Sequence, residues 1–469
     1  MIQPAYDKIC ILIHLENTKI QVYMIHLRAE QVPQVFGRHI NATGMMPMVL
    51  DMRESQGVRL IDKISGNSYL DFFGFFASSM LGMNHPKLTS DSEAFDRLTD
   101  AAVNKVANSD IQTAHMAGFL ETFYRVAQSD ALPYAFFISG GALAVENALK
   151  AAFDWKVRKN LAKGISLERG QQVMHLREAF HGRSGYTLSL TNTSDPWKTR
   201  YFPKFDWPRI LNPKITFPLS EHLEDVESME AQALEEAKSF FLTRKDEIAC
   251  IILETIQGEG GDNHFRPEFL QALKNLSLEN DALLIFDEVQ CGSGITGTFW
   301  AWEQLGVTPD LLAFGKKTQV CGVLAGPRLD EVEDHVFVKP GRINSTWGGN
   351  LVDMVRADRI LEIMEEEILL SNAASMGAHL LNRLNALTEE SEHFSNARGR
   401  GLMCAVDVSS RSLRDDLLSR CFEQGVIIIG CGESSIRFRP ALTITEEEID
   451  EGINVLERVI PRVSTALVS

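Results

Sequence analysis

The segment Ala282–Gln290, ALLIFDEVQ, decides how the fold of this chain is interpreted. Its apolar run LLIF is typical of a strand buried on both faces, as in a parallel sheet that helices cover on both sides. The run ends abruptly at Asp287 and Glu288. Ligands of open α/β sheets bind beyond the carboxyl ends of the strands, and a carboxylate beside so apolar a strand needs a partner that justifies its charge. The segment therefore predicts an α/β fold with a ligand site at this strand end.

A second buried strand ends in a lysine. The run Leu311–Phe314 is followed by Gly315 and Lys316. An acid and a lysine, each just past a buried strand, suggest two groups that hold one cationic cofactor bearing an aldehyde. Further expected strands alternate with helices, which is the pattern of an α/β protein with a mainly parallel sheet. These expected strands are 135–138, 172–176 and 248–253.

The bulk composition is typical of a large folded protein. The chain has 469 residues, of which 45% are hydrophobic and 23% charged, so it is long enough for two or more domains. Its net charge of −17 argues against non-specific binding to nucleic acid or to an anionic membrane. No segment approaches the roughly eighteen uninterrupted apolar residues that a membrane span needs. We therefore expect small-molecule substrates, no nucleic acid partner and no membrane contact.

The cysteines and the N-terminal residues indicate where in the cell the protein is located. The seven cysteines are scattered without a CxxC pair or zinc-like spacing, which is typical of reduced thiols in a cytoplasmic protein without a metal site. Residues 1–23 contain an apolar run, 9–13, that His14 and Glu16 interrupt, and no small-residue cleavage site follows it. We expect this stretch to be a peripheral extension, or an artefact with Met24 as the true start, and not a signal peptide.

A glycine turn precedes a strong predicted helix. Ser139–Ala142, SGGA, leads directly into a helix over 143–160. Free amide N–H groups at a helix N-terminus bind phosphate, so Gly141 and Ala142 are candidates for an anion site. The alternative is a plain tight turn, because glycine pairs before helices are common. The turn is not GxGxxG and no acid follows at the right distance, which disfavours a nicotinamide nucleotide.

Other candidates lie in loops that follow predicted strands. In Glu178–Gly185, Phe180 can lie on a planar ring and Arg183 can bind a carboxylate bidentately, unless they are a core phenylalanine and a surface arginine. In QGEGGD, three glycines surround Glu259 and leave it free to swing, unless it is a loop carboxylate in solvent. Phe76 ends an aromatic run that is either a core strand edge or a pocket wall, and such runs are more often core.

These candidates match the needs of pyridoxal 5'-phosphate. That cofactor requires a lysine for the Schiff base, a carboxylate at the pyridine nitrogen, an anion site for the phosphate and a flat side chain over the ring. The chain resembles class III aminotransferases, which are fold-type I pyridoxal-phosphate enzymes, from about Met24 to its end. Within the class, GGALAVENALKAAFDWK and FGKKTQVCG are most similar to the L-lysine 6-aminotransferase group. The segments that carry the resemblance are FISGGALAVENALKAAFDWK, REAFHGRSGYTLSLTNT, ETIQGEGGDNHFRPEF, LLIFDEVQCGSGITG, LAFGKKTQVCG and NSTWGGN.

The resemblance implies a division into domains. We expect a large pyridoxal-phosphate-binding domain at 76–343 with a mainly parallel seven-stranded sheet. A smaller α+β domain is expected at 344–469, and residues 24–75 are expected to pack with it.

The resemblance also assigns roles around the cofactor. Lys316 takes the Schiff-base position, with Lys317 as its competitor, and Asp287 is the partner of the pyridinium nitrogen. Gln290 corresponds to the group that reaches the phenolic oxygen. Phe180 covers the ring, and Gly141 and Ala142 hold the phosphate.

Substrate and subunit roles follow in the same way. The implied reaction is a ping-pong transfer of the ε-amino group of L-lysine to 2-oxoglutarate, giving glutamate and 2-aminoadipate 6-semialdehyde, which cyclises. Arg439 would bind the α-carboxylate of 2-oxoglutarate, Glu259 would neutralise that arginine while lysine is bound, and Arg183 would hold the distal carboxylate. Phe76 would form the pocket wall. Thr346, with Asn344 close by, would contact the cofactor of a neighbouring subunit, which implies a homodimer.

The sequence departs from the family pattern at two positions. Phe76 stands where relatives carry a smaller residue, and Thr255 stands where proline is usual. Both positions bear on which ω-amine the site prefers.

Three functions rival transamination of lysine. They are transamination of ornithine or 4-aminobutyrate, an aminomutase reaction, and a non-catalytic role for a protein of the same fold.

Overall fold

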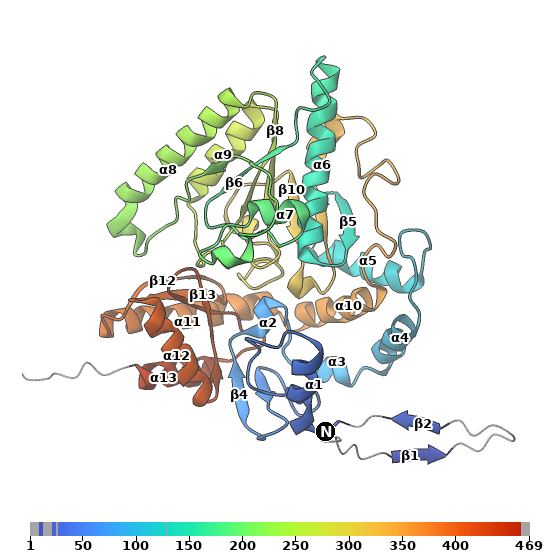
Figure 1. Ribbon diagram of the computed structural model, residues 1–469, viewed down its shortest axis with the longest axis vertical. Coiled ribbons are helices and arrows are strands. Elements are labelled where there is room, and N and C mark those ends of the chain that lie inside the picture. The colour runs from blue at the N-terminus through green and yellow to red at the C-terminus, as the bar shows by residue number, and fades with distance from the viewer. Residues whose placement is uncertain (1–8, 13–20, 25–26, 128, 461–469) are drawn as a thin grey trace, which may run out of the picture.

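The computed structural model describes residues 9–12, 21–24, 27–127 and 129–460. Most of the stretch that we expected to be a peripheral extension, 1–23, lies outside these residues. Its described parts are strand β1 (Ile9–Leu12) and most of β2 (Gln21–Met24), which pair antiparallel with each other. Figure 1 shows this hairpin lying away from the rest of the protein.

The large sheet has seven strands in the order β5-β11-β10-β9-β8-β6-β7. Strand β11 runs antiparallel to both neighbours and the other pairs are parallel, which confirms the expected mainly parallel seven-stranded sheet. The strands are β5 (Tyr134–Ile138), β6 (Gln172–Leu176), β7 (Arg209–Ile210), β8 (Ile248–Glu254), β9 (Leu283–Asp287), β10 (Leu311–Phe314) and β11 (Cys321–Ala325).

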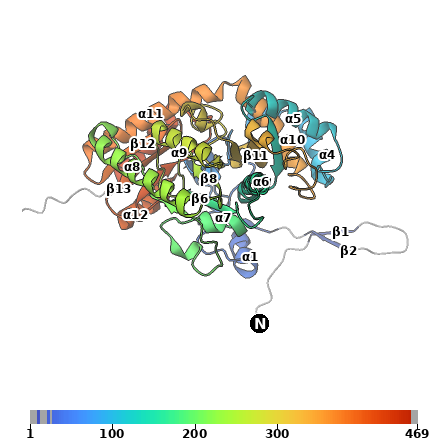
Figure 2. The same cartoon turned by 90° about the horizontal axis from the view of Figure 1, so that it is seen from above.

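Strand β9 is buried on both faces, as its sequence predicts. Leu284 and Phe286 belong to one core with residues of α8 (Leu219–Thr243) and α9 (Pro267–Glu279), whereas Leu283 and Ile285 belong to another with α6 (Gly141–Ala162). Figures 1 and 2 show α8 and α9 on one side of the sheet and α6 on the other. Because side chains alternate along a strand, an unbroken apolar run supplies both cores at once.

The C-terminal part forms a separate antiparallel sheet in the order β12-β13-β16-β15. Helices α11 and α12 pack against it, and α13 packs against these two helices. A third sheet joins β14 (Val426–Ile427), parallel, to the hairpin of β3 (Arg59–Ile61) and β4 (Ser68–Asp71), so the N-terminal segment shares a sheet with the C-terminal part. The other elements here are β12 (Phe394–Arg400), β13 (Met403–Val408), β15 (Ile429–Cys431), β16 (Ser435–Phe438), α11 (Leu369–Glu390), α12 (Arg411–Glu423) and α13 (Glu446–Val459).

Helix α10 (Leu351–Glu366) packs against α4 and α5 and so contacts the part of the chain that contains the large sheet. None of the helices in the described ranges is long and apolar enough to cross a membrane. The remaining helices and 3-10 turns are α1 (Val32–His39), α2 (Gly74–Ala77), α3 (Pro86–Thr89), α4 (Ser92–Val103), α5 (Ala114–Ala127), α7 (Gly185–Leu190), η1 (Ala29–Gln31), η2 (Pro196–Lys198), η3 (Ala301–Gln304), η4 (Lys316–Thr318) and η5 (Pro327–Glu331).

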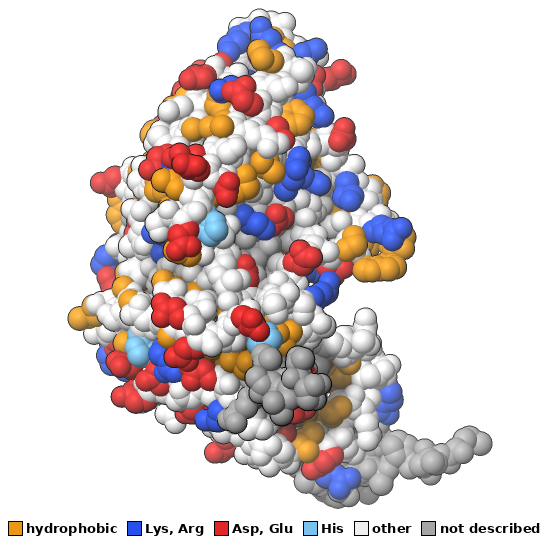
Figure 3. All heavy atoms as spheres, turned by 90° about the vertical axis from the view of Figure 1, so that its left-hand side faces the viewer, with side chains coloured by type: hydrophobic (Ala, Val, Ile, Leu, Met, Phe, Trp, Pro, Cys, Tyr) orange, Lys and Arg blue, Asp and Glu red, His pale blue; other side chains and the backbone are white. Residues whose placement is uncertain are grey.

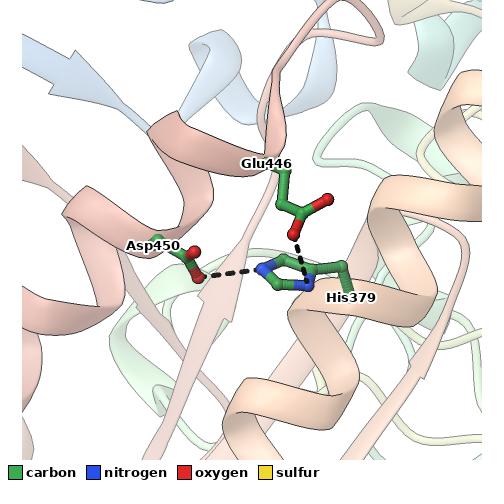
Figure 4. A group of neighbouring side chains, drawn as sticks. All are labelled: His379, Glu446 and Asp450. Carbon is green, nitrogen blue, oxygen red and sulfur yellow. Dashed lines mark hydrogen bonds and ion pairs between the residues drawn. The ribbon is translucent and has the colours of Figure 1, made fainter.

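Charged side chains connect α11 to α13. His379 Nε2 lies 2.8 Å from Asp450 Oδ1, and Glu446 lies on the other side of the imidazole ring (Figure 4). Histidine and carboxylates are also the residue types that bind metals, but Arg383 already donates to the same Asp450 oxygen. A fixed guanidinium repels a metal ion, so we interpret this cluster as a clamp between the two helices. Elsewhere, acidic and basic side chains alternate over the face that Figure 3 shows.

Candidate active site

Three adjacent strands bring the predicted acid and lysine to one edge of the sheet. The register pairs Asp287, the last residue of β9, with Glu254 at the end of β8 and with Ala313 near the end of β10. Lys316 follows β10 after a single glycine and begins the turn η4. The two groups inferred from separate segments of the sequence therefore lie on neighbouring strands.

A histidine holds the Asp287 carboxylate. His181 Nδ1 lies 2.8 Å from Asp287 Oδ2, and the Val289 N–H donates to Oδ1 at 3.0 Å. Both side chains are buried. His181 is not among the residues predicted from the sequence, although its loop follows β6 and a buried acid requires a partner. That requirement, applied to each polar residue at the strand ends, is the signal that could have identified it.

Lys316 has an environment that favours a neutral amine. Burial lowers its pKa to about 8, and the positive charges of Arg437 and Arg439 add to the effect, while Asp287 and Glu254 oppose it. Its backbone has a φ of 55°, which turns the chain sharply after β10. A lysine that is partly neutral near physiological pH is a competent nucleophile and base.

The neighbouring lysine points elsewhere. The Lys317 side chain is fully buried, and its Nζ donates to the Ala77 carbonyl at 2.9 Å. Burial lowers the pKa of Lys317 well below its ordinary value. This hydrogen bond ties η4 to α2, and it favours Lys316 over Lys317 as the reactive amine.

The N-terminus of α6 lies beside the same strand end. Gly140 has a φ of 103°, which only glycine adopts readily, and a Cβ on Gly141 would lie 2.7 Å from the Val289 side chain. Gly141 and Ala142 are the first residues of the 22-residue helix α6, whose first N–H groups have no partner within the helix. Free N–H groups at a helix N-terminus can bind an anion, which is the role predicted for Gly141 and Ala142.

A buried carboxylate connects two loops of the site. Glu254 accepts from the Phe180 N–H at 2.9 Å and from the Gly258 N–H at 3.0 Å. It thereby fixes the backbone of Phe180 relative to the loop that carries Glu259. Burial raises the pKa of Glu254 to about 7, and the nearby Asp287 charge adds to this while His181 and the two N–H groups oppose it.

The expected pair of Glu259 with Arg439 is wrong. Glu259 Oε2 instead lies 2.8 Å from Arg437 Nη2. Arg439 is buried against Asp262 and also donates to the Phe438 carbonyl. Arg437 and Arg439 are two residues apart at the end of β16 and point to the same face, so the motif IRFRP does not distinguish them. Asp262, for which the sequence predicts no role, forms an ion pair with Arg439.

Gln290 and Phe76 lie next to these arginines. Gln290 Oε1 accepts from both Arg437 and Arg439, at 3.3 Å each. The Phe76 ring lies 5.8 Å from the Arg437 guanidinium carbon and is 50% exposed, so it is not a core residue. Its φ of 57° interrupts the helical geometry of α2. The pocket-wall alternative fits this placement better than the core alternative.

The loop after β6 contributes two cations. Arg183 is exposed, and its Nη2 donates to the Lys198 carbonyl at 3.4 Å. Lys198 Nζ lies 2.6 Å from Glu259 Oε1, a contact that the sequence does not reveal because sixty-one positions separate the two residues. Glu259 thus lies between a lysine and an arginine. Burial alone would raise its pKa, but the Arg437 and Lys198 charges outweigh burial and lower it.

Asn344 and Thr346 are not brought to the strand-end cluster. Both are exposed; Asn344 accepts from the Ser345 N–H, and the Thr346 carbonyl accepts from Ser109. Within the described ranges their hydrogen bonds go to these residues and not to Lys316 or Asp287. Thr255, the departure from proline, is buried with its hydroxyl 2.9 Å from Cys291 Sγ.

Comparisons with known proteins agree with this arrangement. The model of the aminotransferase class-III family matches residues 40–460. L-lysine-epsilon aminotransferase of Mycobacterium tuberculosis is 53% identical over 93% of this chain and 96% of its own length, and that of Streptomyces clavuligerus is 49% identical over 94% and 96%. A solved structure of the lysine aminotransferase from M. tuberculosis superposes with a TM-score of 0.91 over 93% of this chain and 99% of the other. A probable 4-aminobutyrate aminotransferase of Caenorhabditis elegans is 31% identical over 90% and 89%. The chain therefore belongs to the class-III aminotransferase family.

Proposed function

We propose that this protein transfers the ε-amino group of L-lysine to 2-oxoglutarate with pyridoxal 5'-phosphate as its cofactor. The observation that carries the chemistry is the half-buried Lys316 beside the histidine-held Asp287 on adjacent strand ends. The lysine preference is supported by the step in identity, from 49–53% with lysine-epsilon aminotransferases to 29–32% with 4-aminobutyrate aminotransferases.

The residues present fit the cofactor. Lys316 would hold its aldehyde, Asp287 its pyridine nitrogen and Gln290 its phenolic oxygen. The tight turn at Gly141 and Ala142 leaves space and free N–H groups for its phosphate, and Phe180 lies on the loop fixed by Glu254. When bound, pyridoxal phosphate supplies an electron sink for the carbanion that forms on the substrate.

Catalysis depends on what this chain does with protons and charge. Lys316 Nζ, once free, takes the proton from the ε-carbon of lysine, which its lowered pKa permits near neutral pH. The His181 ring forms a hydrogen bond with the Asp287 carboxylate and so orients it.

We assign the switch between substrates to Glu259 and Arg437. While lysine is bound, Glu259 neutralises Arg437, because a buried guanidinium without a partner carries a large desolvation penalty. When 2-oxoglutarate binds, Glu259 moves aside and Arg437 takes the α-carboxylate. Arg183 holds the distal carboxylate of either substrate.

The assembly and location are part of the same proposal. We infer a homodimer in which Thr346 contacts the cofactor of the partner subunit and Asn344, a substrate candidate, lies close by, because both are exposed and their hydrogen bonds go to Ser109 and Ser345. We infer a cytoplasmic location, which the free thiols of the six cysteines with described side chains support.

The test offers the purified protein L-lysine, L-ornithine or 4-aminobutyrate, each with 2-oxoglutarate, and measures glutamate and the cyclic imine formed from the aldehyde product. We expect lysine to give both products with a specificity constant about tenfold or more above those of the other two amines. A faster reaction with ornithine or 4-aminobutyrate would show that this amine, and not lysine, is the preferred substrate. If none of the three amines is turned over, the result would favour the alternative of a non-catalytic protein with the same fold.

A further inference from the structure

Glu259 has two cationic partners, one for each carboxylate oxygen. Oε1 lies 2.6 Å from Lys198 Nζ and Oε2 lies 2.8 Å from Arg437 Nη2. The three residues come from distant parts of the chain: the turn η2, the loop after β8 and strand β16. A carboxylate bridged in this way can leave one cation and keep the other.

The two cations lie at different depths. The Arg437 side chain is 2% exposed, whereas the side chains of Glu259 and Lys198 are 26% and 25% exposed. Lys198 and Glu259 are therefore both partly exposed, and Arg437 lies deeper than either of them. A movement of Glu259 away from Arg437 and toward solvent keeps it within reach of Lys198.

Backbone contacts keep the Lys198 turn beside the Glu259 loop. Ser194 Oγ donates to the Gly432 carbonyl at 3.0 Å, and the Gly432 N–H donates to the Glu259 carbonyl at 2.9 Å. The Arg183 guanidinium donates to the Lys198 carbonyl. The Asp195 side chain caps the turn itself through the Trp197 N–H. Lys198 is thus presented to Glu259 by a supported turn and not only by its own flexible side chain.

We propose that Lys198 is a positioning residue that sets substrate preference by holding the Glu259 carboxylate when it leaves Arg437. Arg437 then becomes available to the carboxylate of a keto acid while Glu259 stays paired. This inference rests on the proposed exchange of carboxylates at Arg437, but not on which amine the protein uses.

The charges explain why such a residue matters. Without Lys198, Arg437 would be the only cation in contact with Glu259, and the inner pair would be favoured over every open arrangement. A dicarboxylate would then have to displace Glu259 into solvent with no compensating contact. The Lys198 contact also exists while Glu259 is paired with Arg437, so the exchange depends on the strength that this contact gains once Glu259 no longer shares its charge with Arg437. Since each 1.4 kcal/mol is a factor of ten in affinity, a gain of about that size in one charge-assisted hydrogen bond predicts about a tenfold change.

The test measures binding of glutarate, an unreactive dicarboxylate, to the holoenzyme by calorimetry. Lys198→Met is expected to raise the Kd of glutarate about tenfold, whereas Lys198→Arg, which keeps the charge, should stay within about twofold of the original protein. Lys204→Met is the matched control, because Lys204 is an exposed lysine of the same loop whose side chain contacts Thr199 and not Glu259. Thermal midpoints of all variants are compared, and we expect them to be unchanged.

A double-mutant cycle separates this role from direct binding of the ligand. In a Glu259→Ala background there is no carboxylate to hold, so Lys198→Met should not change the Kd of glutarate further. If Lys198→Met weakens binding equally in that background, Lys198 contacts the ligand itself and the inference is wrong. It is equally wrong if Lys198→Met leaves the Kd unchanged in the original protein. Because glutarate does not react, these outcomes do not depend on lysine being the amino donor.

The kinetic signature must agree with the binding result. Lys198→Met should raise the Michaelis constant for the keto acid about tenfold, while the half-reaction with the amino donor changes less than about twofold. Equal changes in both half-reactions would indicate a structural role and overturn the inference. A failure of lysine as donor with an intact glutarate effect would contradict the proposed function alone.

Discussion

At the scale of single residues, the lowered pKa of Lys316 gives a prediction about cofactor attachment. Only the neutral amine attacks an aldehyde, and burial together with Arg437 and Arg439 brings the pKa of Lys316 to about 8. The rate at which the apoprotein takes up pyridoxal phosphate covalently should therefore rise with pH and level off above about 8. Below that pH it should fall about tenfold per pH unit, as measured by absorbance after rapid mixing. A midpoint near the ordinary lysine value would mean that the site does not perturb this amine.

Substitutions of Arg437 and Arg439, the two arginines of IRFRP, should have different effects: one on catalysis and the other on stability. Arg437→Ala should lower the specificity constant for the keto acid roughly a hundredfold, because it removes a charged partner worth about 2–5 kcal/mol when desolvated, and should leave the thermal midpoint nearly unchanged. Arg439→Ala leaves the buried Asp262 without its cation and should destabilise the fold by about 3–5 kcal/mol. Activity and thermal unfolding of both variants check the assignment. The opposite pattern would restore Arg439 as the substrate residue.

Single residues also show where the sequence is sufficient. The placement of Lys316, Asp287 and Gly141 could be predicted because each stands at or just after the end of a recognisable strand, and strand ends meet at one edge of a parallel sheet. His181, Lys198 and Arg437 could not be assigned, because their roles depend on contacts between loops. The chemical roles of all the site residues stay predictions; they are those given to Lys316, Asp287, Gly141, Ala142, Phe180, Gln290, Arg183, Phe76, Asn344 and Thr346.

At the scale of elements, Glu288 connects strand β9 to the turn η3. The sequence predicts only a binding role for the strand end, but the Glu288 carboxylate accepts from the Ala301 and Trp302 N–H groups, at 2.7 Å each. Burial raises the pKa of Glu288 to about 8, and those two N–H groups oppose the shift. In the folded protein this side chain therefore binds a proton that the unfolded chain releases at lower pH.

This linkage gives a prediction for stability. The pKa of Glu288 is higher in the folded than in the unfolded state. The stability that this group contributes to the folded protein is therefore lost as pH rises from about 4.5 to about 8. Glu288→Gln lacks that dependence, so its stability relative to the original protein should increase between about pH 5.5 and about pH 8. Urea unfolding midpoints at the two pH values measure the difference. A constant difference would show that Glu288 is ionised in the folded protein.

Elements differ in how well the sequence predicts them. Strands β9 and β10 and helix α10 can be predicted because a long apolar run or a clear helical period marks each. Strand β12, with NARGR in its C-terminal part, was not predicted, because it carries polar residues and a register shift against β13. Its pairing is decided by its neighbours in the sheet and not by its own composition. The domain boundaries at 75/76 and 343/344 stay predictions.

At the scale of the whole molecule, the proposed dimer is the main open prediction. The chain mass is 52.4 kDa, so light scattering of the holoenzyme should give twice that value. Substituting Thr346 by Ala should leave the mass unchanged and weaken cofactor retention, if the residue contacts the partner's cofactor as we infer. A protein that is monomeric and still active would contradict the shared site.

The overall fold was predictable because one physical rule covers most of it. Apolar strands alternating with helices require a parallel sheet covered on both faces, and the observed sheet has this form with β11 as its antiparallel exception. The pairing of β4 with β14 was not predicted at the level of strands, since it joins residues 70 and 426. Such distant pairings depend on how the whole chain packs.

The central claim, transfer of the ε-amino group of lysine by the Lys316 centre, is tested most directly by isotope labelling. The protein is incubated with 2-oxoglutarate and with L-lysine that carries ¹⁵N either at the ε-position or at the α-position, and the glutamate formed is analysed by mass spectrometry. We predict ¹⁵N-labelled glutamate from the ε-labelled lysine and unlabelled glutamate from the α-labelled lysine. Labelled glutamate from the α-labelled lysine, or no glutamate from either, would contradict the account.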